Sequence, residues 1–195
     1  NSDSELKYKL YDKRKEMKVF LDGEAWFNVT ENPGRVFTVH TPYYDVCVTG
    51  TKFNVKAYRE DNEIVTTLEH GSVFIPSNER FKMKSGKFLL PGEQLIYNRE
   101  KHSISKNKVE ISIYSAWKEN KLIFINMSLK ELIIMLERKY GVDIEVADTS
   151  IFKYHYDGTI RNESILEIMD LLQLTLPIQY EIVDNTVKIK RKEAQ

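Results

Sequence analysis

Cysteine is almost absent from the 195-residue sequence, and long hydrophobic runs are absent altogether. The single thiol, at Cys47, excludes an internal disulfide and any metal site built on paired thiolates. No apolar stretch approaches the roughly 20 residues that a membrane-spanning helix needs, and the first residues lack the pattern of a signal peptide. We therefore expect the chain as given to be soluble, while its cysteine content fits the cytoplasm as well as the periplasm.

An excess of charge of one sign is missing too. The 29 Lys and Arg side chains balance the 29 Asp and Glu side chains, and the isoelectric point is near 7.1. Proteins that bind nucleic acids usually carry a basic excess, because their cationic side chains release counterions from phosphates. The balanced composition argues against a nucleic-acid partner.

Motifs that carry catalysis or bind cofactors are not found either. There is no H-E-x-x-H, C-x-x-C or G-x-S-x-G sequence and no glycine-rich phosphate loop. The acidic cluster Glu60, Asp61 and Glu63 lacks the glycine and the spaced oxygen ligands of a calcium loop, which favours a solvated hairpin tip. Four histidines are scattered without metal-ligand spacing: His40, His70, His102 and His155. The sequence therefore predicts no catalytic residues, no metal, no cofactor and a function other than that of an enzyme.

What is present changes in character near residue 117. From residue 17 to about residue 110, apolar and polar residues alternate in short segments, separated by turn signals such as Asp22-Gly23 and Pro91-Gly92. One segment and its turn take roughly eight to twelve residues, which is typical of consecutive strands. The pattern predicts an all-β domain over residues 1–114, arranged as a roll, a sandwich or a β-solenoid.

Residues 115–195 instead predict a small α+β domain with two strand-helix-strand units. Ser128 and Glu131 have the spacing of a helix capping box, and Ser164 and Glu167 repeat that spacing 36 residues later. Each box opens an apolar stripe with helical period: Leu129, Leu132, Ile133, Leu136 and Tyr140, then Ile165, Ile168, Met169, Leu172 and Leu176. We expect both stripes to face one shared core.

Three aromatic residues between the two helices form the candidate binding site. Phe152, Tyr154 and Tyr156 alternate with polar residues, so they share one face of a predicted strand. That face either packs beneath the helices or forms a docking surface for a partner. The last strand, with Lys188 and Lys190 turned outward, is predicted to be a sheet edge guarded against pairing. The aromatic strand is therefore the preferred partner-binding site.

Five ordered motifs in the first half resemble the FecR domain. They are residues 23–29 (GEAWFNV), 37–39 (FTV), 46–55 (VCVTGTKFNV), 68–73 (LEHGSV) and 90–94 (LPGEQ). The second half is similar to the C-terminal domain of FecR homologues of Bacteroidetes type. The residues that carry this similarity are Trp117, 122–124 (LIF) and 136–140 (LERKY). That domain in turn resembles the short STN domain, a fold that fits the duplicated capping box.

The resemblance implies the periplasmic part of a membrane-anchored anti-sigma factor. In such a relay, a cytoplasmic segment binds an extracytoplasmic-function sigma factor, and one helix crosses the inner membrane. The periplasmic part receives a signal from an outer-membrane TonB-dependent transducer. Neither the sigma-binding segment nor the membrane helix lies within this sequence. The implied partners are the signalling domain of the transducer and, through the segment that is absent here, the sigma factor.

Two further expectations concern the completeness of the β domain and an alternative function. Residues 1–8 resemble the middle of a longer stretch in the family, which implies that the first strands of the β domain are missing and that an unpaired edge could favour dimerisation. The alternative function is that of a periplasmic carbohydrate-binding or cell-envelope scaffold module. Exposed tryptophans distinguish this alternative, and we expect Trp26 and Trp117 to be packed.

Overall fold

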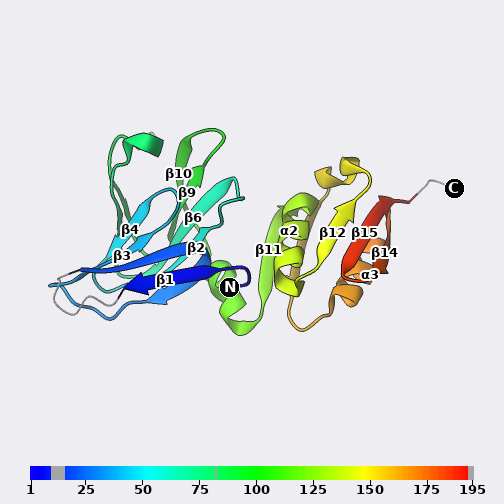
Figure 1. Ribbon diagram of the computed structural model, residues 1–195, viewed down its shortest axis with the longest axis horizontal. Coiled ribbons are helices and arrows are strands. Elements are labelled where there is room, and N and C mark those ends of the chain that lie inside the picture. Colours follow the sequence, from blue (N-terminus) through cyan, green and yellow to red (C-terminus); the bar gives the residue numbers. More distant parts are fainter. Residues whose placement is uncertain (10–15, 82, 193–195) are drawn as a thin grey trace. The chain divides into compact units, whose positions relative to one another are not determined.

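A computed structural model provides the structure of the chain and describes residues 1–9, 16–81 and 83–192. The chain forms two compact units, Asn1–Ser115 and Ala116–Gln195 (Figure 1). Each unit has a hydrophobic core of its own.

The first unit is built mainly from strands. Its elements are β1 (Glu5–Lys9), β2 (Glu16–Asn28), β3 (Val36–His40), β4 (Asp45–Val48), β5 (Lys52–Ala57), β6 (Glu63–His70), β7 (Val73–Ile75), the 3-10 helix η1 (Glu79–Phe81), β8 (Lys87–Leu89), β9 (Glu93–Asn98), β10 (Ser103–Lys108) and α1 (Ile111–Ser115). The predicted strand-rich first half is confirmed, and η1 and α1 are short helical additions to it.

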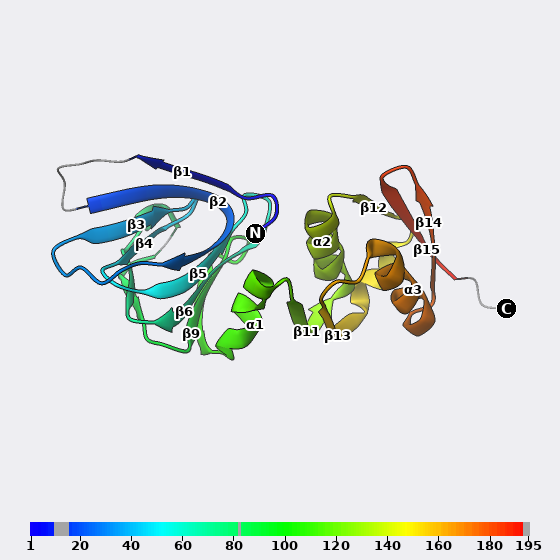
Figure 2. The same cartoon turned by 90° about the horizontal axis from the view of Figure 1, so that it is seen from below.

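The ten strands of this unit belong to one curled sheet (Figure 2). Its order is β10-β9-β6-β5-β2-β3-β4-β7-β8, with β1 beside β2. Among the described residues of this unit, β2 and β3 are the one parallel pair. Strands from β9 to β8 along this order contribute buried side chains to the core, including Val39, Phe53, Leu68, Leu89 and Leu95. Of the three arrangements that the sequence left open, a single curled sheet corresponds best to the roll.

Strand β2 connects the two parts of the curled sheet, because it pairs with different strands along its length. Its first part pairs with β1 and β3, and from Gly23 onward it pairs with β5. Gly23 has a φ of 125°, and a Cβ atom there would lie 2.4 Å from the Ser4 Oγ atom. Glycine alone satisfies both constraints. The predicted turn at Asp22-Gly23 is therefore wrong, since the pair lies inside a 13-residue strand.

The second unit contains the strand-helix-strand order twice. Its elements are the 3-10 helix η2 (Ala116–Glu119), β11 (Leu122–Ser128), α2 (Leu129–Tyr140), β12 (Asp143–Val146), the 3-10 helix η3 (Thr149–Lys153), β13 (His155–Ile160), α3 (Ile165–Thr175), β14 (Ile178–Val183) and β15 (Thr186–Arg191).

Both predicted capping boxes form at the helix starts. The Glu131 amide donates to the Ser128 hydroxyl oxygen at 3.3 Å, and the Ser128 amide donates to the Glu131 carboxylate at 3.1 Å. Ser164 and Glu167 make the same two bonds at 3.3 and 2.7 Å. Two of the amides that would otherwise lack partners at each helix start are thereby satisfied. Gly141 ends α2 in the left-handed conformation, with a φ of 63°.

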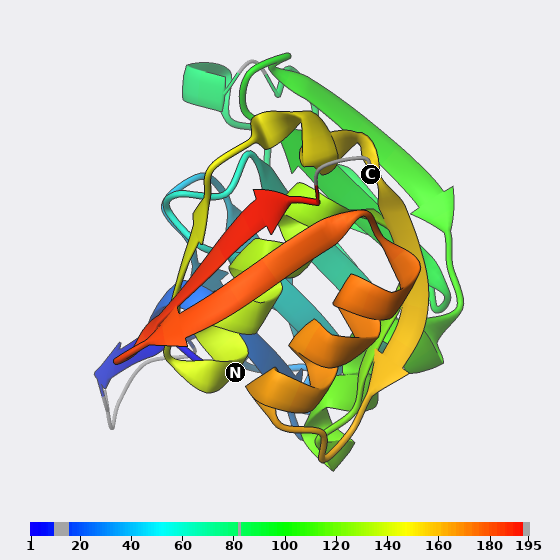
Figure 3. The same ribbon diagram turned by 90° about the vertical axis from the view of Figure 1, so that its right-hand side faces the viewer.

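The apolar stripes of α2 and α3 meet in one core, as predicted. The ribbons of both helices are seen in Figure 3. Its buried members from the helices are Leu129, Leu132, Ile133, Leu136, Ile168, Met169 and Leu172. The strands add Phe124, Ile144, Ile160, Ile178, Val187 and Ile189. A single core serves both helices because each of them presents one apolar stripe to it.

The strands of the second unit form two small sheets in the described part of the chain, β11-β13 and β12-β15-β14. Strand β15 is the middle strand of its sheet, parallel to β12 and antiparallel to β14. The prediction that the last strand is an edge guarded by lysines is therefore wrong. Lys188 lies opposite Glu145 on one neighbour and Glu181 on the other, so its outward charge faces carboxylates across the sheet.

The buried stripe makes a direct stability prediction. Leu172→Ala removes a side chain that is 2% exposed and leaves a cavity in the shared core, so the free energy of unfolding should fall by about 2–5 kcal/mol. Leu136→Ala, at 0% exposure, should have a similar cost. Leu174→Ala is the matched control, because Leu174 lies on the same helix at 82% exposure and should change stability by less than about 0.5 kcal/mol. Urea unfolding measures all three. Equal effects at Leu172 and Leu174 would contradict the helix orientation.

Candidate interaction surface

The three candidate aromatic residues lie in the second unit. Within residues 1–9, 16–81 and 83–192, His, Cys, Asp and Glu side chains do not gather in threes at a geometry suited to a metal ion. Over the same residues, every helix is too short or too polar to cross a membrane.

The three candidate aromatic residues lie on consecutive parts of the chain, but they do not share one strand. Phe152 lies in η3, Tyr154 follows its last residue, and only Tyr156 belongs to β13. The predicted single strand is wrong because the Asp148 side chain accepts a hydrogen bond from the Ser150 amide at 2.9 Å and so caps a helical turn. All three aromatic side chains are half-buried and pack against the core.

Tyr156 connects this aromatic set to α3. Its ring centroid lies 6.5 Å from that of Phe124, and its hydroxyl forms a hydrogen bond with the Thr175 hydroxyl. Thr175 in turn donates to the Leu171 carbonyl at 2.9 Å. The start of β13 and the last turn of α3 are therefore joined by hydrogen bonds at an exposed position.

The outer side of α3 exposes three large apolar side chains. Leu166, Leu171 and Leu174 are 51%, 54% and 82% exposed, and we call them the α3 leucine face. At 3.6 residues per turn, these positions lie on the side of the helix opposite the buried stripe. Large apolar side chains that gather on one exposed helix face are typical of a surface that binds another protein.

Acidic residues lie among the leucines on the outer side of α3. The helix contains Glu167 and Asp170 and no basic residue. The Tyr180 hydroxyl of β14 donates to the Asp170 carboxylate at 2.5 Å and so fixes the position of one of these charges. At about 100° per residue, Asp170 lies between Leu166 and Leu174. Glu167 lies between Leu174 and Leu171. A partner that covers this face therefore meets apolar and negative groups side by side.

The sequence contains a signal for the α3 leucine face that one buried stripe does not explain. Residues 171, 172 and 174 are all leucine, and three such positions cannot share one narrow side of a helix. Once Leu172 is assigned to the core, the other two must face away from it. A helix that is apolar on two sides is a recognisable pattern for a second binding surface.

The bond between Tyr180 and Asp170 makes a prediction about ionisation. The hydrogen bond to the Asp170 carboxylate, together with burial, raises the pKa of Tyr180 from 10.0 to about 12. Asp170→Asn removes the negative charge that disfavours the tyrosinate, so the pKa of Tyr180 should fall toward 10.0. Tyrosinate absorbance followed against pH measures the shift, and Tyr180→Phe identifies which step in the titration belongs to this residue. An unchanged titration in Asp170→Asn would show that the bond does not form.

Along the whole chain, the fold is similar to that of solved regulators. Two crystal structures of a candidate anti-sigma factor from Parabacteroides distasonis, at 1.65 and 2.50 Å resolution, match with TM-scores of 0.88 and 0.87. Each is 28% identical in sequence, and the matches cover 99% of this chain and 89% and 88% of those chains. The class of protein that this fold defines is that of the anti-sigma factors.

Both units also match models of one protein family. The model of the FecR protein matches residues 1–74, and the model of the FecR C-terminal region matches residues 121–189. The chain belongs to the FecR family of anti-sigma factors, as the ordered motifs in its sequence predict. No functionally curated protein matches it.

Proposed function

We propose that this chain is the periplasmic signal-relay region of a FecR-family anti-sigma factor anchored in the inner membrane. It receives a signal from an outer-membrane TonB-dependent transducer and controls an extracytoplasmic-function sigma factor through a cytoplasmic segment outside this sequence. The observation that carries the proposal is the match of both units to FecR models, together with the full-length similarity to a candidate anti-sigma factor. Such a relay needs surfaces that bind proteins.

The second unit is the proposed docking module for the signalling domain of the transducer, and we assign it an STN-like fold. The α3 leucine face and the adjoining Tyr156 form the centre of the surface, since they are joined through Thr175 and lie next to an exposed helix end. Phe152 and Tyr154 support this surface from the core side. The carboxylates of Glu167 and Asp170 among the leucines favour a partner that presents basic residues beside apolar ones.

Strand β13 offers a second mode of contact beside the leucines. In the described part of the chain β13 pairs with β11 alone, so its other edge has no paired strand, as strand addition by a partner requires. A relay must also release its partner. We therefore expect a small interface and a micromolar dissociation constant, which corresponds to about −8 kcal/mol.

The tryptophans do not support the alternative function of a carbohydrate-binding or scaffold module. Trp26 and Trp117 are both half-buried, as expected from the sequence. The Trp26 indole donates to the Glu69 carboxylate at 2.9 Å, which fixes its ring against the sheet. Neither residue is the flat, exposed platform that this alternative requires.

The relay proposal is tested by calorimetric titration of the 195-residue chain with the signalling domain of its cognate transducer. We expect micromolar binding that weakens at least about tenfold in Leu171→Asp and Leu174→Asp, since each substitution places a charge in an apolar contact. Leu90→Asp is the matched control, because Leu90 is 62% exposed in the first unit and its replacement should leave the affinity unchanged.

Three results separate the parts of this proposal. Loss of affinity in the two α3 variants alone supports the surface. Equal affinity in all variants would place docking elsewhere on the chain. Absence of binding by the unsubstituted chain would contradict the transducer as partner. Circular dichroism of each variant checks that α3 still folds.

A further inference from the structure

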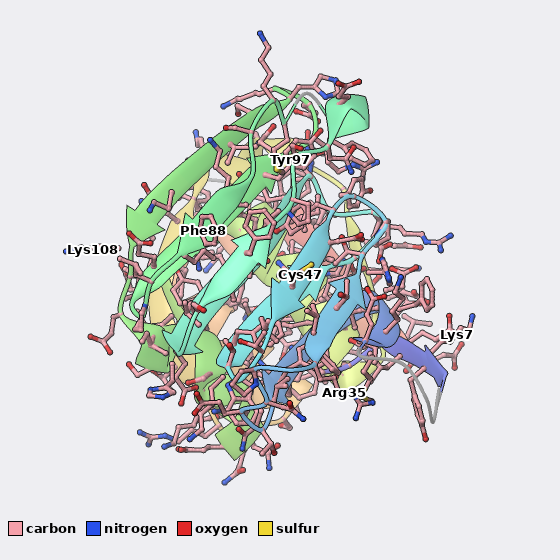
Figure 4. All side chains as sticks on the ribbon, turned by 90° about the vertical axis from the view of Figure 1, so that its left-hand side faces the viewer. Lys7, Arg35, Cys47, Phe88, Tyr97 and Lys108 are labelled. Atoms are coloured by element: carbon pink, nitrogen blue, oxygen red, sulfur yellow. The ribbon has the colours of Figure 1, made fainter. Side chains whose placement is uncertain are left out.

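The first unit contains a recess whose lining residues are not among those proposed for docking. It has a volume of about 370 Å³ and lies where η1, the loop before β4, the loop before β6 and the hairpin between β9 and β10 come together. Figure 4 shows Tyr97 at the end of the sheet that carries η1. The recess is lined by Tyr43, Asn62, Phe81, Tyr97, Arg99, Glu100 and His102.

Three aromatic rings form the floor and walls of this recess. Tyr97 is 1% exposed and belongs to the core, while Tyr43 and Phe81 are half-buried against it. The Phe81 ring meets Tyr43 and Tyr97 edge-on, with centroids 5.7 and 5.9 Å apart, and the Tyr43 and Tyr97 centroids are 6.3 Å apart. The rings therefore hold one another in place.

Arg99 is fixed at the rim by the backbone. Its Nη1 atom donates to the carbonyl oxygens of Arg59 and Asp61 at 2.5 and 2.9 Å, and its guanidinium carbon lies 4.9 Å from the Tyr43 ring centroid. The two bonds use the hydrogens of Nη1, while the N–H groups of Nε and Nη2 add further donor capacity. Arg99 is therefore a positioned donor rather than a mobile surface charge.

Acceptors lie at the same rim. The Asn62 amide donates to the Glu100 carboxylate at 2.7 Å, and that carboxylate has acceptor sites for further hydrogen bonds. The Tyr97 hydroxyl lies 3.2 Å from the Nδ1 atom of His102. The rim thus combines a guanidinium, an amide, a carboxylate and an imidazole around an aromatic floor.

We propose that this recess binds a neutral saccharide ring. An anionic ligand would face the Glu100 carboxylate, and a cationic ligand would face the Arg99 guanidinium, so the paired charges favour a neutral molecule. A ring with an apolar C–H face and several hydroxyl groups packs against the aromatic walls and bonds to both kinds of rim group. The volume falls within the range of small-ligand sites, with an aromatic lining and a few placed polar groups. The site does not involve the tryptophans.

Saturation-transfer NMR on the 195-residue chain tests this proposal with defined probes. The probes are the methyl glycosides of glucose, galactose, mannose and N-acetylglucosamine, with methyl glucuronide and glucosamine as the acidic and basic comparisons. We expect transfer to the ring C–H protons of at least one neutral glycoside, with a dissociation constant on the order of 1 mM. The two charged sugars should bind at least about tenfold more weakly.

Substitutions inside and outside the recess show whether the saturation transfer arises from binding there. Phe81→Ala removes a wall of the recess, and Glu100→Gln changes an exposed acceptor without disturbing the core; each should weaken binding at least about tenfold. Phe88→Ala is the matched control, because Phe88 is a 66% exposed aromatic residue on β8 outside the recess, and its replacement should change nothing. No transfer to any neutral glycoside would overturn the proposal, as would transfer that persists in both recess variants or preferential binding of the acidic sugar.

Discussion

The meeting of the α2 and α3 stripes in one core is the contact on which the second unit depends. Leu136 and Leu172 are almost fully buried there, together with side chains from β14 and β15. A helix with 3.6 residues per turn has one rotation that buries Ile168, Met169 and Leu172 together. That rotation turns the α3 leucine face to solvent. The proposed docking surface is therefore a geometric consequence of the core rather than an independent feature.

Local signals in the sequence predicted local structure well. The two capping boxes, the glycine end of α2 and the two buried stripes depend on residues within a few positions of one another, and all of them form as expected. The failures mostly involve contacts between distant residues, and the helical turn within the aromatic set is the local exception. The place of β15 between β12 and β14 cannot be read from alternating lysines, because the same alternation suits a middle strand with carboxylates on both sides. The aromatic set was interrupted by a helical turn that Asp148 caps. Residues from four separated segments line the recess in the first unit, so no local sequence pattern predicts it.

The first unit shows the same dependence on a distant contact at Gly23. The sequence presents an Asp-Gly pair, which usually marks a turn. Here the glycine lets β2 pass close to Ser4 and exchange its partners β1 and β3 for β5. The sheet can then curl around its core, and one end of the curled sheet gathers the loops that hold Tyr43, Asn62, Phe81 and Arg99. A rigid sheet with polar groups on its loops is the usual way in which a protein places a binding site.

The magnitude of apolar burial limits what the α3 leucine face can do alone. Its three side chains are already partly buried, so covering them completely contributes roughly 4 kcal/mol. Association costs about 4–15 kcal/mol in lost translational and rotational freedom, so this burial by itself does not produce micromolar binding. The remainder has to come from contacts around the leucines. In the proposed interface, strand addition at the β13 edge supplies backbone hydrogen bonds, and the carboxylates of Glu167 and Asp170 speed encounter with a basic partner. By this proposal the leucines determine where the partner docks, the strand edge contributes much of the affinity, and the two carboxylates select a basic partner.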